Sequence, residues 1–103
     1  MNVLAPADVG ASVTRALWGE VTARLRAVEV HTAEEGITLR FYFDGEPDED
    51  ERDSASMVGA EVAADFPDLT VGEEIIVTAA HVAIPRQDGW HIIYARKEPS
   101  LAR

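Results

Sequence analysis

The sequence has no cysteine, few basic residues and no long apolar run. Without cysteine, the chain can form neither a disulfide framework nor a thiolate zinc site, and it has no cysteine nucleophile. Nine basic residues stand against nineteen acidic ones, and the resulting net charge of −10 would repel nucleic acids and anionic membranes. No stretch approaches the roughly 18 apolar residues that a membrane-spanning helix needs. We therefore expect no direct nucleic-acid binding, no membrane insertion and a basic protein as the partner.

The composition and the N-terminus indicate a cytoplasmic globular protein. A length of 103 residues with 47% hydrophobic content suits one domain with its own core. We expect this single domain to cover residues 1–103, with residues 98–103 as a frayed tail. Residues 1–6 lack the cationic and apolar regions of a signal peptide.

Two segments have apolar residues at helical spacing. Residues 6–18 form the first, in which we expect Trp18 to belong to the core. Residues 48–65 form the second, where Asp48 and Glu51 have the spacing of a capping box at a helix start. The apolar positions are Val9, Val13, Ala16 and Leu17 in the first segment and Ala55, Val58, Val62 and Phe66 in the second.

Four segments alternate as strands do. Residues 25–32 and 37–43 read as one hairpin, and residues 73–84 and 90–96 as another, joined by a loop at residues 85–89. The resulting order, α-β-β-α-β-β, predicts an α+β fold. We expect a four-stranded, mostly antiparallel sheet with two helices packed on one face, because this arrangement buries every apolar stripe.

Residues 44–53 contain seven acidic residues and one arginine, a local charge of −6. Three interpretations compete: a solvated helix start, a docking surface for a basic partner, and a divalent metal site. The calcium-loop pattern fails, because Glu49 stands where the loop needs glycine and Ala55 where it needs glutamate. Tyr42 precedes this segment on the polar face of its strand, where an exposed aromatic either anchors an interface or bridges its neighbours on the sheet surface. The predicted partner-binding residues are Tyr42, Asp44, Glu46, Asp48, Glu49, Asp50, Glu51 and Asp53.

Catalytic and cofactor motifs are missing from the sequence. No serine lies in a nucleophile elbow, and the glycines form no phosphate-binding loop. His31, His81 and His91 fall on predicted strands without the spacing of a helical zinc site. We therefore predict no catalytic residue, no metal and no cofactor.

Four segments resemble a family of small acidic bacterial proteins associated with immunity to contact-dependent and related polymorphic toxins. They are ALWGEV at residues 16–21, LRAVEV at 25–30, LRFYFDGE at 39–46 and EVAADFP at 61–67. The resemblance covers about half of the chain. It implies a non-enzymatic protein that neutralises a cognate toxin, often a basic nuclease, by binding and masking its active surface.

The charge and the resemblance together favour an immunity or inhibitor protein that binds a basic toxin domain through residues 44–53. One alternative is a regulatory or adaptor module that forms homodimers through an edge strand at residues 90–96. The second alternative is a small enzyme or divalent-metal protein.

Overall fold

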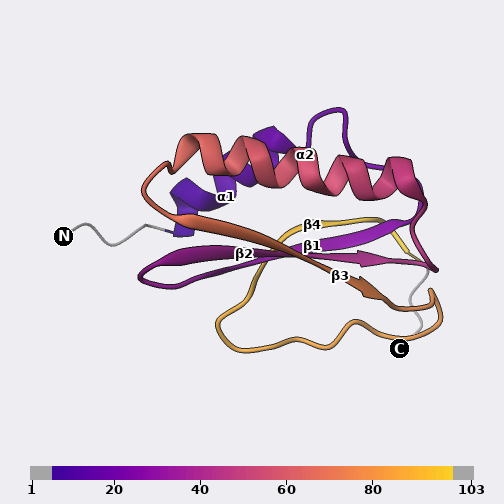
Figure 1. Cartoon of the computed structure of the whole chain (residues 1–103). Helices are drawn as coiled ribbons and strands as arrows, with labels where there is room; N and C mark the ends of the chain where they lie inside the picture. The colour runs from indigo at the N-terminus through magenta and orange to yellow at the C-terminus, as the bar shows by residue number, and fades with distance from the viewer. Residues whose placement is uncertain (1–5, 99–103) are drawn as a thin grey trace.

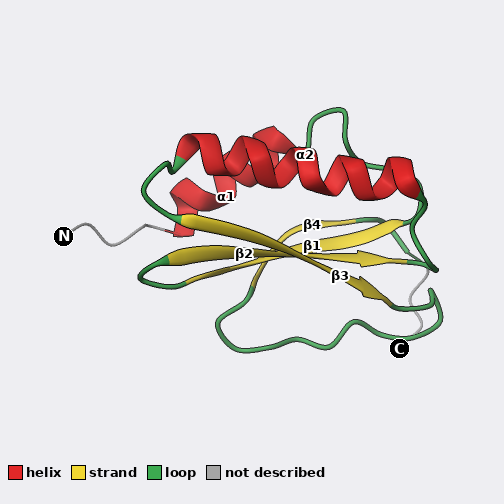
Figure 2. Cartoon of the chain, in the orientation of Figure 1, coloured by secondary structure: helices red, strands yellow, loops and turns green. Residues whose placement is uncertain are grey.

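A computed structural model describes residues 6–98, which form two layers, a four-stranded sheet with both helices on one face (Figures 1 and 2). The strand order is β3-β2-β1-β4, with two antiparallel pairings and one parallel pairing. The predicted α+β class, element order and mostly antiparallel sheet are confirmed. The elements are α1 (Pro6–Ala16), β1 (Leu25–Thr32), β2 (Gly36–Phe43), α2 (Glu49–Asp65), β3 (Thr70–Val77) and β4 (His91–Ala95).

The capping box fixes the start of α2. Asp48 is the N-cap residue, and its side chain accepts a hydrogen bond from the backbone N–H of Glu51 at 2.8 Å. In return, the Glu51 carboxylate accepts one from the backbone N–H of Asp48, also at 2.8 Å. Two N–H groups that a helix start leaves without partners are thereby satisfied.

α1 ends at Ala16, two residues before the predicted end. Gly19 has a φ of 82°, a left-handed conformation that glycine adopts without strain, and the chain turns there toward β1. Trp18 is consequently 74% exposed, and its predicted place in the core is wrong. Leu17 is still buried, so the core boundary falls between these two neighbours.

The predicted hairpin of β1 and β2 is confirmed and provides half of the buried hydrophobic cluster. The strands pair antiparallel from Thr32 opposite Ile37 to Leu25 opposite Phe43. Alternate side chains point toward the helices, as the period of a strand requires. The buried cluster combines Val28, Val30, Ile37, Leu39, Phe41 and Phe43 of the sheet with Val9, Val13, Val58 and Val62 of the helices.

The predicted hairpin of residues 73–84 and 90–96, with its loop at 85–89, is wrong. β3 ends at Val77 and pairs in parallel with β2, whereas β4 pairs with β1 at the opposite edge of the sheet. α2 returns the chain to the end of the sheet where β2 begins, so the next strand runs in the same direction as β2. Alternating apolar residues do not distinguish a parallel strand from an antiparallel one.

Residues 78–90, here called loop 78–90, connect β3 to β4 across the sheet face opposite the helices (Figure 1). Arg40 on β2 holds this loop, because its Nη1 donates a hydrogen bond to Gln87 Oε1 at 2.6 Å. Its guanidinium carbon also lies 3.8 Å from the ring centroid of Trp90, a cation–π contact. The polar face of the sheet is therefore covered rather than open to solvent.

Candidate partner-binding surface

The acidic residues of segment 44–53 divide into two groups. Four of them pair with arginines of the same chain: Asp44 with Arg96, Glu46 with Arg52, and Asp48 and Glu51 with Arg24. Glu51 is buried and accepts hydrogen bonds from both Arg24 and Thr22. The hydrogen bonds from Arg24, followed by the one from the Asp48 backbone, lower the pKa of Glu51. These four carboxylates are thus already paired within this chain, although the side chains of Glu46 and Asp48 remain exposed.

The other three acids, Glu49, Asp50 and Asp53, are exposed and form no ion pair with any described residue. At the helical period they lie on one side of the first turns of α2, opposite the buried side. We call these three residues the acidic face of α2. Met57, one turn beyond Asp53, continues the same side of the helix and is 54% exposed.

Tyr42 is buried, with 3% exposure, so its predicted exposure is wrong. Its hydroxyl donates a hydrogen bond to Glu29 Oε1 at 3.0 Å. Burial raises the pKa of Tyr42. The alternation of β2 correctly placed Tyr42 opposite the phenylalanines, but loop 78–90 covers that face. Tyr42 is therefore not available to a partner at the surface.

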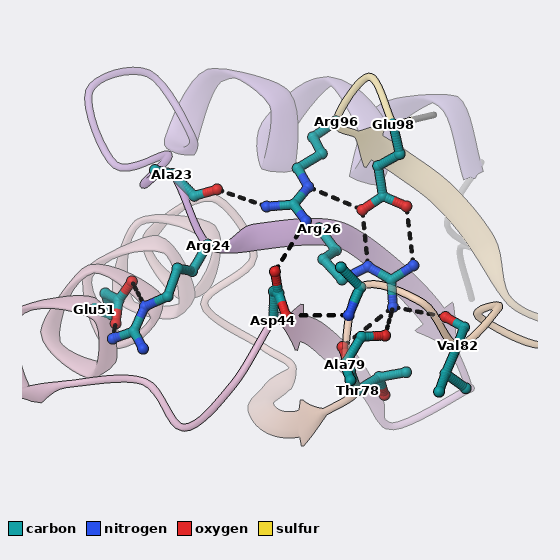
Figure 3. A network of polar contacts seen from close by, with 11 residues as sticks. Ala23, Arg24, Arg26, Asp44, Glu51, Thr78, Ala79, Val82, Arg96 and Glu98 are labelled. Atoms are coloured by element: carbon teal, nitrogen blue, oxygen red, sulfur yellow. Dashed lines mark hydrogen bonds and ion pairs between the residues drawn. The ribbon is translucent and has the colours of Figure 1, made fainter. Parts of the chain in front are cut away.

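An arginine–carboxylate network, which the sequence pattern did not predict, joins the ends of β1, β2, β3 and β4 (Figure 3). Arg26 on β1 donates to both carboxylate oxygens of Glu98, at 2.8 and 2.9 Å. Arg96 donates to Glu98, to Asp44 and to the carbonyl of Ala23. We define this network as Arg26, Asp44, Arg96 and Glu98. Only Arg26 could have indicated this network from the sequence, because it is a charged residue within an apolar predicted strand.

The same network connects Asp44 to the start of loop 78–90 and holds that part of the loop by hydrogen bonds. Asp44 accepts a hydrogen bond from the backbone N–H of Ala80 at 3.0 Å. Arg26 Nη1 donates to the carbonyls of Thr78, Ala79 and Val82 at 2.9 to 3.2 Å. Glu98, which we expected to begin a frayed tail, is held in place, and residues 99–103 lie outside the described residues.

The network makes a prediction about acid stability. Hydrogen bonds from Arg26, opposed by desolvation and assisted by Arg96, lower the pKa of Glu98 from 4.5 to about 2. Because the folded state has the lower pKa, this carboxylate stabilises the fold fully above about pH 4.5 and progressively less down to about pH 2. Urea unfolding at a series of pH values should show Glu98→Gln less stable than wild type at pH 6, with the difference shrinking as the pH falls from about 4.5 toward 2. A difference that does not change with pH would contradict this assignment.

The described residues were also compared with the requirements of a metal site and of a membrane-spanning helix. Residues 6–98 contain no group of three or more His, Asp or Glu side chains that could hold a metal ion. His31 lies against Trp90, with ring centroids 5.2 Å apart. No helix among these residues is long and apolar enough to cross a membrane.

The chain is similar to a known protein family. No curated protein matches the chain. The family model described as MafI2 immunity protein matches residues 6–98, from the start of α1 to the Glu98 that the arginines hold. This match contains all four segments on which the resemblance to immunity proteins rests. The chain therefore belongs to the MafI2 immunity protein family.

Proposed function

We propose that this immunity protein acts in the cytoplasm by binding a toxin with a basic surface through the acidic face of α2, without catalysis. The observation that carries this proposal is the division of the acidic segment. Four of its carboxylates pair with arginines of the same chain, whereas Glu49, Asp50 and Asp53 form no ion pair among the described residues. Helix capping accounts for Asp48 and Glu51, and the first turn of α2 also favours the charges of Glu49 and Asp50, but none of the three pairs with a described cation.

The chemistry of the neighbouring surface supports the same proposal. Met57 is an exposed apolar side chain beside the acidic face, and methionine is enriched in protein interfaces. An apolar contact next to charged groups combines short-range binding with long-range attraction. The net charge of −10 adds to the attraction of any basic partner.

The test needs a candidate toxin domain, to be sought among the proteins encoded beside this gene, and uses that domain as the partner. Size-exclusion chromatography with light scattering should show this protein as a monomer alone and as a one-to-one complex with that domain. Separate elution at micromolar concentrations of both proteins would contradict the proposal. A stable dimer of the protein alone would instead favour the homodimeric adaptor, since β4 is an edge strand in the described sheet.

A further inference from the structure

A cavity of about 230 Å³ lies on the sheet face opposite the helices, beside the end of loop 78–90. Its lining includes Glu29 on β1 and Ile92 on β4, which are paired directly across the two strands. The loop contributes further side chains to the lining, among them Arg86, Asp88 and Trp90. These five residues carry two carboxylates and one guanidinium, and the guanidinium of Arg40 lies against the ring of Trp90, 3.8 Å from its centroid.

Glu29 is an unusual residue for the middle of a central strand, because its side chain is only 2% exposed. Its one hydrogen bond among the described residues comes from a neutral donor, the hydroxyl of Tyr42. Arg40 is its direct neighbour on β2, yet Arg40 donates to Glu74 and Gln87. No ion pair of Glu29 is present within residues 6–98.

A buried carboxylate without a cationic partner is costly in free energy. Oε1 of Glu29 accepts from Tyr42, and no described residue donates to Oε2. No fully buried side-chain oxygen in the described part of the chain lacks a hydrogen bond, so Oε2 is not sealed inside the protein. Glu29 is one of the residues that line the cavity, so a donor placed in the cavity lies beside this carboxylate.

We propose that this cavity receives a single arginine side chain of the toxin, with the guanidinium donating to Glu29. This inference rests on the proposed function, because it assumes a protein partner. A guanidinium suits the site better than an ammonium, because it is weakly hydrated and its planar N–H groups can donate two parallel hydrogen bonds to one carboxylate. Asp88 supplies a second carboxylate in the lining, and Trp90 and Ile92 supply apolar surface.

A small-molecule titration tests the cavity without the toxin. N-acetyl-arginine amide should shift the backbone amide NMR signals of Gly89, Trp90 and Ile92, and N-acetyl-lysine amide should shift them less. The neutral analogue N-acetyl-citrulline amide should leave them unchanged. Arg86→Gln, which removes the cation of the lining, should tighten arginine binding about two- to threefold. Equal shifts with the citrulline and arginine compounds would overturn the proposal.

The matched variant is Glu29→Gln, which keeps an oxygen to accept from Tyr42 but removes the charge. It should abolish the response to N-acetyl-arginine amide while its melting temperature stays close to that of wild type. Against the toxin domain, its Kd should rise at least about tenfold, mainly through faster dissociation.

The outcomes separate the two proposals. If wild type and Glu29→Gln bind the toxin equally well, the cavity is not the arginine site, although the proposed function stands. If wild type does not bind the toxin, the proposed function is wrong, and the arginine titration still decides whether the cavity binds a guanidinium.

Discussion

Arg26→Met is expected to lower the free energy of unfolding by about 3–5 kcal/mol, because it removes one partner of a buried ion pair. Arg26 is 3% exposed and makes hydrogen bonds to Glu98 and to three backbone carbonyls of loop 78–90. Methionine fills a similar length without any donor, so the three carbonyls lose this partner and Glu98 keeps only Arg96. Urea unfolding followed by tryptophan fluorescence and circular dichroism measures the change.

Arg52→Met is the matched control, since it breaks the exposed pair with Glu46 and should cost less than about 1 kcal/mol. Hydrogen exchange adds a local readout, because the amides of Ala80 and Val82 should lose protection in Arg26→Met. A destabilisation of Arg26→Met no larger than that of the control would show that the network does not hold the loop.

Replacing the acidic face, as Glu49→Gln, Asp50→Asn and Asp53→Asn together, is expected to slow association with the toxin about tenfold at low ionic strength. These side chains are exposed and unpaired within the described chain, so their removal takes away attraction without breaking a contact of the fold. Stopped-flow fluorescence measures the association rate. The difference from wild type should shrink at high salt, because exposed charges are screened beyond about 8 Å at physiological ionic strength and beyond about 3 Å at 1 M salt.

The chain offers a control with the same change in net charge. Glu34→Gln, Glu35→Gln and Asp68→Asn together remove three exposed acids from the opposite end of the sheet, at the β1–β2 turn and just before β3 (Figure 1). This variant should associate at nearly the wild-type rate. If both variants slow association equally, only net charge matters and the acidic face is not the docking surface.

Local sequence patterns correctly predicted the elements that are formed by contacts between residues close together in the chain. The capping box of Asp48 and Glu51 located the start of α2, and the alternation of β2 located the β1–β2 hairpin. The position of β3 depends on a pairing with β2 across a whole helix, and alternation alone does not reveal its direction. The hairpin predicted for residues 73–96 was wrong for this reason.

The candidate site was predicted only in outline, for a similar reason. The sequence located the acidic segment, but the arginines that pair with Asp44 and Glu51 lie 52 and 27 residues away. These distant contacts reduce the free carboxylates to Glu49, Asp50 and Asp53. Likewise, Tyr42 lies on the predicted face of its strand, and a loop more than thirty residues later covers that face. The docking role of the acidic face remains a prediction.

The most direct test of the account is a titration of the toxin's activity with this protein. Neutralisation by binding predicts that activity falls in proportion to the protein added and reaches zero at one molecule per toxin molecule. Loss of activity that continues with time at far lower ratios would reveal catalysis and contradict the account, as would full activity in the presence of excess protein.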